Sequence, residues 1–499
     1  MSYYIGIDVG TSSTKALVIN ASGEVLLSMS HEYSFQTPQA NWAECDPADW
    51  WKATVQALTE ITTQFDPQQI VGIGLSGQMH GLVLLDADGN VLRPCMMWND
   101  QRTATECVEL TEAAGGAARV LEITGNPIMT GFTAPKIRWV QKHEPEVWAQ
   151  VAKILLPKDY IRYCLSGDFY SEVSDASGMS LLDVGKREWS STMLEACGVG
   201  RSQLPELTES TVASTTVSEV AAALTGLKAG TPLIAGGGDQ AAAAVGCGIV
   251  KPGVVSCSLG TSGVVFAHAE AFAPETEGRL HAFCSSVPGK WHHMGVQLSC
   301  AGSYQWFYDT MGQGATFDQL NAESEWIAAG SEGLLFLPYL SGERCPHADP
   351  NARGVFFGLS RMHGRGHLGR AVMEGVAFGL RDALELMKPL GLAPKEIVVN
   401  GGGAKSSLWR QILADVFNAK IVTVNASEGA AFGAAVLAAV GTGAYSSVVE
   451  ASQAMLRITG MTEPGPDAAT YDRIYPVYEK LYGTLKDSFE ALAKVQGIL

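Results

Sequence analysis

Hydrophobic runs separated by polar turns predict a strand–turn–strand unit at the start of the chain and another in its middle. Residues 4–9 form a β-rich run, residues 10–14 a polar turn that begins with glycine, and residues 15–20 a second β-rich run. The second unit also has a Gly-Thr-Ser turn, and it consists of residues 254–259, 260–263 and 264–267. Two such units about 250 residues apart indicate two related halves, each with its own hairpin.

Helix and strand patterns alternate through both halves, which predicts a mixed α/β architecture. Apolar stripes at helical spacing predict helices at residues 47–63, 149–165, 190–196, 367–388 and 408–417. β-rich runs predict strands at residues 70–76, 81–85, 231–238, 333–339 and 396–400. The uncharged run 429–444 consists of Ala and Gly rather than Leu and Ile, so we expect a tightly packed buried helix and not a membrane span. A boundary near residues 246–251 predicts domains of residues 1–246 and 247–499.

Three glycine-rich turns have the composition of phosphate-binding turns: Gly10-Thr11, Gly260-Thr261 and Gly402-Gly403. A turn without side chains lets backbone N–H groups approach phosphate oxygens, and a neighbouring hydroxyl adds a donor. No segment has the spacing of a Walker A loop, and none of these turns has that of a GxGxxG loop. Taken alone, each turn is better explained by a plain β-turn, and it is their combination with the two matching hairpins that favours phosphate binding.

Two aspartates lie next to such turns. Asp8 ends the first predicted strand, where a carboxylate can hold Mg²⁺ beside phosphates; the alternative is an Asx-turn residue. Asp239 follows a strand and three glycines, at the carboxyl edge of a sheet where ligands commonly bind; the alternative is a helix N-cap.

Composition narrows the class of protein. The chain has 499 residues, 46% of them hydrophobic and 17% charged, with a net charge of −17, so we expect a globular protein that binds neither nucleic acid nor membrane. Ten cysteines are scattered singly and the amino terminus lacks a signal-peptide pattern, which predicts a cytoplasmic location. The 55 glycines, about 11% where about 7% is usual, must serve specific turns or close contacts.

Five segments in the same order resemble those of the FGGY carbohydrate kinases, and the resemblance covers nearly the whole chain. These segments are residues 5–15, 131–139, 258–262, 354–374 and 398–403. The resemblance implies the two-domain fold of sugar kinases, actin and the Hsp70 ATPase, a ribonuclease H-like fold. In that fold each domain has a mixed sheet with flanking helices, and the active site lies in the cleft between the domains.

The resemblance also implies transfer of the γ-phosphoryl group of ATP to a sugar hydroxyl. Asp239 would be the general base and Asp8 would organise Mg²⁺. The residues implied at the nucleotide are Thr11, Lys15, Gly260, Thr261, Gln305, Gly402, Gly403 and Ser407.

The implied substrate depends on residues 77–81. Where glycerol kinases have an Arg-Glu pair, this chain has Met79 and His80, and Gly131 stands where they have a Tyr. With residues 98–100, this pattern resembles family members that phosphorylate D-xylulose, and the implied sugar contacts are Gln78, Met79, His80 and Asp239. The alternatives are a kinase for L-ribulose, L-fuculose or gluconate, and a non-catalytic sugar sensor. For His80 alone, the alternative is an ordinary surface or core imidazole. The partners implied are the sugar and ATP, with a homodimer and a monomer both open.

Overall fold

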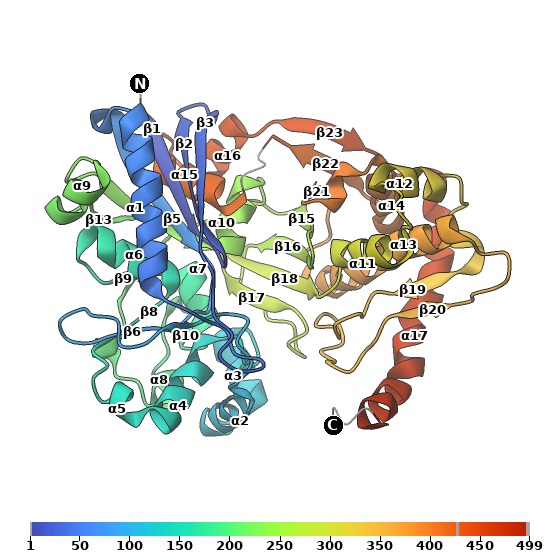
Figure 1. Ribbon diagram of the computed structural model, residues 1–499, viewed down its shortest axis with the longest axis horizontal. Coiled ribbons are helices and arrows are strands. Elements are labelled where there is room, and N and C mark those ends of the chain that lie inside the picture. The colour runs from blue at the N-terminus through green and yellow to red at the C-terminus, as the bar shows by residue number, and fades with distance from the viewer. Residues whose placement is uncertain (1, 426–428, 496–499) are drawn as a thin grey trace.

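Two mixed β-sheets lie side by side in the computed structural model, which describes residues 2–425 and 429–495 (Figure 1). The first has the order β13-β14-β5-β1-β2-β3 and the second the order β17-β18-β16-β15-β21-β22-β23. The strands of the first sheet are β1 (Tyr3–Val9), β2 (Ser13–Asn20), β3 (Val25–Glu32), β5 (Ile70–Gly77), β13 (Ala213–Thr216) and β14 (Pro232–Gly238). Those of the second are β15 (Val254–Leu259), β16 (Gly263–Ala269), β17 (His281–Cys284), β18 (Trp291–Gln297), β21 (Glu396–Asn400), β22 (Lys420–Val424) and β23 (Ile458–Thr462).

The two sheets repeat one topology. In the first, β1 pairs antiparallel with β2 and parallel with β5. In the second, β15 pairs antiparallel with β16 and parallel with β21. Each pattern starts from a hairpin with a Gly-Thr-Ser turn, so the prediction of two related halves is confirmed.

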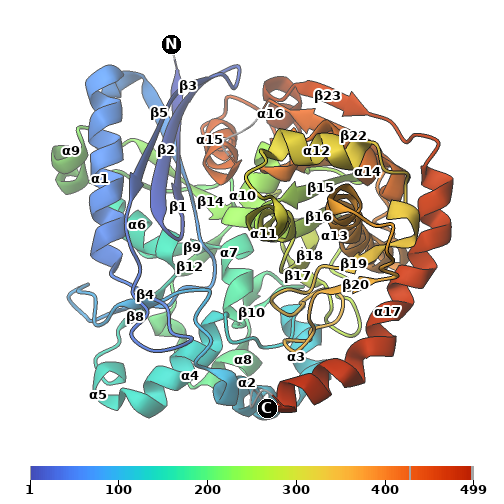
Figure 2. The same ribbon diagram turned by 45° about the vertical axis from the view of Figure 1, so that its right-hand side comes forward.

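Helices cover both sheets. On the first sheet, α1 contacts β2 and β3 while α15 contacts β1 and β5 (Figure 2). The helices around the first sheet are α1 (Pro47–Gln64), α6 (Pro157–Ser166), α9 (Glu219–Thr225), α10 (Asp239–Gly246), α15 (Gly429–Gly441) and α16 (Val448–Met455). Those around the second are α11 (Ala301–Met311), α12 (Phe317–Glu325), α13 (Arg365–Met387), α14 (Ser407–Phe417) and α17 (Ala468–Val495).

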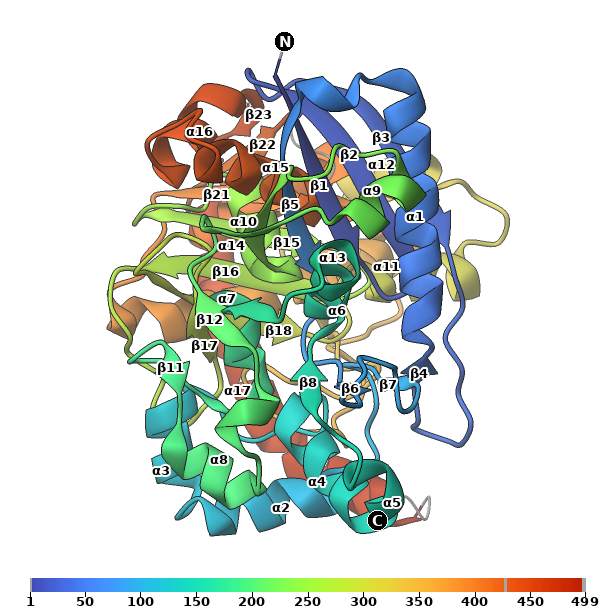
Figure 3. The ribbon, with the colours of Figure 1, turned by 90° about the vertical axis from the view of Figure 1, so that its left-hand side faces the viewer.

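Shorter elements form a region beside the carboxyl edge of the first sheet (Figure 3). They are β4 (Glu44–Cys45), β6 (Val83–Leu85), β7 (Cys95–Met96), α2 (Ala104–Ala113), α3 (Ala117–Thr124), α4 (Thr133–His143), α5 (Pro145–Trp148), β8 (Lys153–Leu155), β9 (Tyr170–Glu172), α7 (Val173–Ala176), β10 (Leu182–Asp183), β11 (Glu188–Trp189), α8 (Ser191–Cys197) and β12 (Glu206–Thr208). A small two-stranded sheet of β19 (Leu335–Leu337) and β20 (Val355–Phe357) extends the second half. No helix in residues 2–425 or 429–495 is long and apolar enough to span a membrane.

The helix predicted at residues 149–165 is wrong in its first half. Residues 153–155 instead form β8, which pairs antiparallel with β6. Pro157 occupies the first turn of α6, where its missing N–H costs nothing, so the helix begins there and not earlier. The strand predicted at residues 81–85 is also shorter, since β6 starts at Val83.

Helix α15 lies on the first sheet with almost no space between backbones. A Cβ atom on Gly6 or on Gly74 would lie 1.9 Å from the carbonyl oxygen of Ala431 or of Ala434. On its other side α15 meets α10, where a Cβ on Gly433 would lie 1.7 Å from the carbonyl oxygen of Ala242. The predicted buried Ala/Gly helix is confirmed, and part of the glycine surplus is explained by these contacts.

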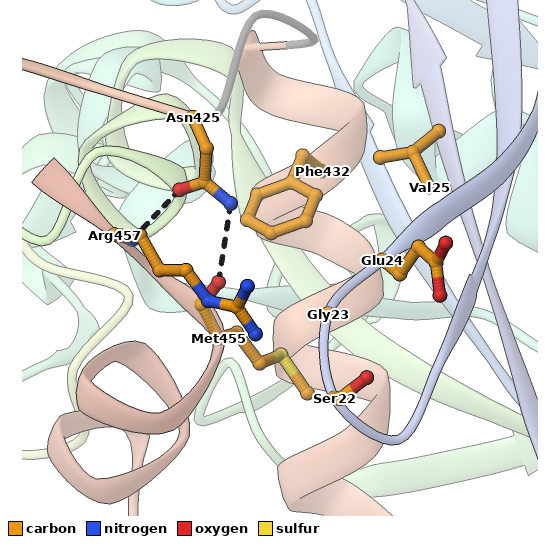
Figure 4. A pocket seen from close by; sticks show the side chains of 8 residues that line it. All are labelled: Ser22, Gly23, Glu24, Val25, Asn425, Phe432, Met455 and Arg457. Carbon is orange, nitrogen blue, oxygen red and sulfur yellow. Dashed lines mark hydrogen bonds between the residues drawn. The ribbon is translucent and has the colours of Figure 1, made fainter. Parts of the chain in front are cut away.

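The turn between β2 and β3 also meets the second half. The Tyr445 hydroxyl donates a hydrogen bond to the Ala21 carbonyl. Beside it lies a cavity of about 440 Å³, with Arg457 and Phe432 on one wall and Glu24 on the other (Figure 4). The turn that follows β2 is therefore in contact with late elements of the chain.

We predict that Gly74→Ala lowers the free energy of unfolding by about 3 kcal/mol or more, because the new Cβ must displace the backbone of α15. Denaturant unfolding followed by circular dichroism measures this. Gly483→Ala is the matched control: Gly483 lies within α17 with nothing within 4 Å of its Cβ position, so this change should leave stability equal or slightly higher. Equal stability of the two variants would contradict the prediction.

Candidate active site

Three parallel strands, β1, β5 and β14, end at one edge of the first sheet, and the predicted chemistry follows their ends. Asp8 is next to last in β1, Gln78 to His80 follow β5, and Asp239 follows β14. This edge is where open α/β sheets bind ligands. The fold therefore brings together the predicted metal, sugar and base positions.

Asp8 is held between two neighbouring strands. It lies opposite Lys15 on β2 and Ser76 on β5, and its Oδ1 is buried without a hydrogen-bond partner among the described residues. Burial raises the pKa of Asp8 to about 6, opposed by the Ser76 hydroxyl and the Lys15 ammonium group. An acceptor oxygen left unpaired in this way suits a divalent cation.

Asp239 is the first residue of α10 and is not its N-cap, which is Gly238. The N-cap alternative is therefore wrong. The backbone that leads to Asp239 makes a tight turn: Gly236 has φ +77°, and a Cβ there would lie 1.6 Å from the Leu75 carbonyl oxygen. Its Oδ1 accepts a hydrogen bond from the Gln240 backbone N–H at 2.7 Å. Burial, and then the negative charge of Asp8, raise the pKa of Asp239 to about 7.

A carboxyl group with a pKa near neutrality can accept a proton from a substrate hydroxyl and release it again. The two carboxylates repel each other, so a cation between them would stabilise both charged forms. No group of three or more His, Cys, Asp or Glu side chains in residues 2–425 and 429–495 is arranged to hold a metal ion. A cation at Asp8 would therefore need oxygen ligands from a bound phosphate or from water.

The first hairpin turn is tied to the neighbouring strand end. The carbonyl oxygen of Gly10 accepts hydrogen bonds from the Gln78 side-chain amide at 3.0 Å and from the Tyr33 hydroxyl at 2.7 Å. The Trp98 indole N–H donates to the Thr11 hydroxyl at 2.9 Å. Gln78, Tyr33 and Trp98 thus fix the position of this turn.

The second hairpin turn opens onto two adjoining cavities. One, of about 500 Å³, is lined by Gly260, Thr261, Gln305 and Gly402 among others. The other, of about 430 Å³, continues from Gln305 and Gly402 to Gly403 and Trp409. Their combined size and their mixed apolar and polar lining suit a nucleotide.

Three predicted nucleotide residues do not line these cavities: Thr11 and Lys15, which belong to the first hairpin, and Ser407. Ser406, and not Ser407, lines the cavity of about 430 Å³ that includes Trp409. Ser406 is also the N-cap of α14, where its hydroxyl accepts from the Trp409 N–H, and Ser407 is the first helical residue.

His80 has an unusual backbone and a fixed ring. Its φ is +70°, in the left-handed region, and its Nδ1 lies 2.7 Å from the Gly178 carbonyl oxygen. Since a carbonyl oxygen only accepts, Nδ1 carries the proton. Burial lowers the pKa of His80 to about 3, so the ring is neutral and Nε2 is an acceptor. Nothing in the described part of the chain hydrogen-bonds Nε2, so it is available to a hydroxyl donor.

Residues of the second half that the sequence did not indicate complete this region. The His80 ring stacks on Phe132 with centroids 4.5 Å apart, and Phe283 of β17 lies 6.3 Å from it. His281 of β17 stacks on Phe283 and bonds the Asn126 side chain through Nδ1 at 2.8 Å. His281 and Phe283 are separated from Asn126, Phe132 and His80 by about 150 positions or more, so no local pattern could have grouped them.

Glu343 and Arg344 also lie near His80. The buried Glu343 carboxylate accepts hydrogen bonds from the backbone N–H groups of Leu298 and Arg344. The charge of Arg344 opposes the burial that raises the pKa of Glu343, and it helps to lower the pKa values of His80 and His281.

This chain belongs to the FGGY family of carbohydrate kinases, and it is therefore an ATP-dependent sugar kinase: the family's N-terminal domain matches residues 3–246 and its C-terminal domain residues 255–442. The xylulose kinase of Escherichia coli (strain K12) is 45% identical over 449 residues, 90% of this chain and 92% of the relative. The xylulose kinase structure from Rhodospirillum rubrum is 31% identical with a TM-score of 0.92, covering 98% of this chain and 100% of that one. A gluconate kinase structure from Lactobacillus acidophilus is 27% identical with a TM-score of 0.93, covering 98% and 99%.

We predict that Asp239→Asn stabilises the protein without ligands at pH 8. The pKa of Asp239 is about 7 in the folded protein, whereas the ordinary value of an aspartate is near 3.9. Between these two pH values the unfolded chain has lost this proton and the folded protein still holds it. The free energy of unfolding therefore falls as the pH rises from about 4 to about 7. An Asn at this position carries no charge, so the variant does not lose this stability. The expected gain in unfolding free energy is about 2–4 kcal/mol at pH 8 and vanishes near pH 4. Thermal unfolding across this pH range checks it, and a gain independent of pH would refute it.

Proposed function

We propose that this protein transfers the γ-phosphoryl group of ATP to D-xylulose and forms D-xylulose 5-phosphate. The observation that carries the chemistry is Asp239, a carboxyl group with a pKa near 7 at the edge where Asp8 and the Gly10 turn also lie. The choice of sugar is supported by the 45% identity to a xylulose kinase over most of both chains.

In the proposed step the sugar's terminal hydroxyl lies beside Asp239. The carboxylate takes the hydroxyl proton while the oxygen attacks the γ-phosphorus in line. The new P–O bond forms as the bond from the γ-phosphorus to the ADP oxygen breaks, and its electron pair stays on ADP. Positioning and charge neutralisation dominate such a transfer, and closure of the two halves would exclude water.

The nucleotide in this proposal runs from the two adjoining cavities to the hairpin turns. Gln305, Gly402 and Gly403 contact the adenosine, with Ser407 beside them. The Gly260-Thr261 turn and the Thr11 and Lys15 hairpin face the phosphates with N–H, hydroxyl and ammonium donors. Asp8 is the residue that would hold Mg²⁺, which neutralises negative charge on the phosphates of ATP.

The sugar in this proposal is held by Gln78, Met79, His80 and Asp239. The neutral His80 ring presents Nε2 as an acceptor, so it binds a hydroxyl group and gives no favourable pairing with a carboxylate. This favours a ketose over gluconate at that position. Gluconate remains the second candidate because of the similarity to a gluconate kinase structure.

The proposal includes the division into domains of residues 1–246 and 247–499 and a cytoplasmic location. In support of the latter, the ten cysteines are all free, as expected in a reducing compartment. For the assembly, a homodimer and a monomer are both open, and analytical ultracentrifugation of the purified protein distinguishes them.

We predict that Asp239→Ala lowers kcat by about 10³-fold or more, because it removes both the base and its positioning. Binding of ATP and of D-xylulose, measured by isothermal titration calorimetry, should stay within a few fold of wild type. Retention of most of the activity would remove Asp239 from the role of base.

We predict that kcat/KM for D-xylulose exceeds that for L-ribulose, L-fuculose and gluconate by at least about 10-fold, in line with the loss of one or more well-placed hydroxyl contacts. ADP release measured across this panel decides the substrate. A higher kcat/KM for gluconate would contradict D-xylulose as the substrate but would leave the proposed phosphoryl transfer intact. Steady ATP turnover that no sugar changes would indicate a sensor.

A further inference from the structure

Lys136 is a fully buried lysine that the proposed chemistry does not use. It is the fourth residue of α4, and its side chain has no exposed surface. Its Nζ donates hydrogen bonds to the carbonyl oxygens of His80 at 2.9 Å and of Gly131 at 2.7 Å. Among the described residues its hydrogen-bond partners are these two carbonyls and not a carboxylate, and the Asp100 carboxylate acts on it only through its charge.

This placement is unfavourable for a cation. Burial lowers the pKa of Lys136 to about 7; Cys95 and the Asp100 carboxylate oppose this shift, and the charge of Arg102 adds to it. The amino-terminal turn of a helix also repels positive charge. Buried charges without an opposite partner cost stability, so fold stability alone does not account for a lysine here.

The groups that Lys136 holds are those that set the His80 ring. The His80 carbonyl also accepts from the Thr133 hydroxyl at 3.1 Å, and Phe132 stacks on the ring. Thr133, Phe132 and Lys136 therefore all act on His80 from one short segment. His80 sits in the left-handed region, which costs a non-glycine residue about 1–2 kcal/mol unless contacts such as these hold it.

The carbonyl group of Gly131 connects Lys136 to the first hairpin turn, where we propose that the phosphates bind. A Cβ on Gly131 would lie 2.6 Å from the Trp98 carbonyl oxygen, so these two backbones are in contact. The Trp98 indole bonds the Thr11 hydroxyl in the first hairpin turn. The Lys136 ammonium group thus joins the loop that contains His80 to the loop that contains Gly131, and the second loop contacts the first hairpin turn through Trp98.

We propose that Lys136 is a positioning residue for the sugar: its ammonium group fixes the His80 and Gly131 carbonyls, and thereby aims His80 Nε2 at a substrate hydroxyl. It does not touch substrate itself. The inference rests on the proposed function, because it takes His80 as a sugar ligand.

The test compares Lys136→Met with wild type. Met fills a similar volume without N–H donors, so we expect the KM for D-xylulose to rise about 10- to 100-fold, as for a ligand displaced by up to about 1 Å. The KM for ATP should change less than about 2-fold. Thr133→Val removes the other donor to the same carbonyl and should raise the sugar KM by a smaller factor. Arg138→Met, a half-exposed cation on the same helix, is the control and should change neither KM.

A rescue experiment separates positioning from a general structural role. In Lys136→Ala, propylammonium ion should lower the sugar KM toward the wild-type value, whereas tetramethylammonium, which has no N–H donor, should not. Thermal unfolding confirms that each variant is folded. An unchanged sugar KM in Lys136→Met, an equal rise in both KM values, or rescue by neither or both ions would overturn the proposal.

His80→Ala keeps the two hypotheses distinguishable. If it leaves the sugar KM unchanged, the proposed sugar site is wrong and Lys136 loses its role with it. If it raises the sugar KM while Lys136→Met does not, only the inference on Lys136 fails.

Discussion

The arrangement of Asp8 and Asp239 at the carboxyl edge of the first sheet depends on how closely helix α15 approaches its neighbours. The helix touches β1 and β5 on one side and α10 on the other, at distances that only glycine allows at Gly6, Gly74 and Gly433. Asp8 is on β1 and Asp239 is the first residue of α10. Because these elements pack backbone against backbone, the two carboxylates have little freedom to move apart. The position of Asp239 is therefore fixed by packing rather than by a dense network of hydrogen bonds around it.

This rigidity has an electrostatic effect. Two carboxyl groups held near each other in a buried place cannot both be charged without cost, and the pKa values of about 6 and 7 express that cost. A cation at Asp8 would relieve the repulsion, and would lower the pKa of Asp239 as well. Binding of such a cation and of a proton would therefore be thermodynamically linked at this edge, each binding more weakly when the other is present.

Much of the fold was readable because it is encoded locally. The two Gly-Thr-Ser hairpins, the strand before Asp239 and the Ala/Gly helix each have a pattern within a short window, and all were predicted. The family resemblance then placed Asp8, Asp239 and His80 at one edge. The structure brings them there, while their roles stay predictions.

The features that the sequence did not predict depend on contacts between residues far apart in the sequence or on the exact residue at which a helix begins. His281 and Phe283 reach the His80 region from the other half of the chain. The strand β8 inside a helical pattern is decided by pairing with β6, which is about 70 residues earlier. The choice between Ser406 and Ser407 depends on a single capping bond. Lys136 was visible in a family segment, but its role became apparent only from the two carbonyls it holds.

The position of α15 also bears on how the chain is made. The first sheet is complete in sequence by Gly238, but the helix that covers its β1 and β5 face lies at residues 429–441. During synthesis that face, with Tyr4, Leu17 and Ile234 on it, stays uncovered while nearly 200 further residues are translated. This face of the first sheet is therefore covered only after residues 429–441 have been made and have packed on it.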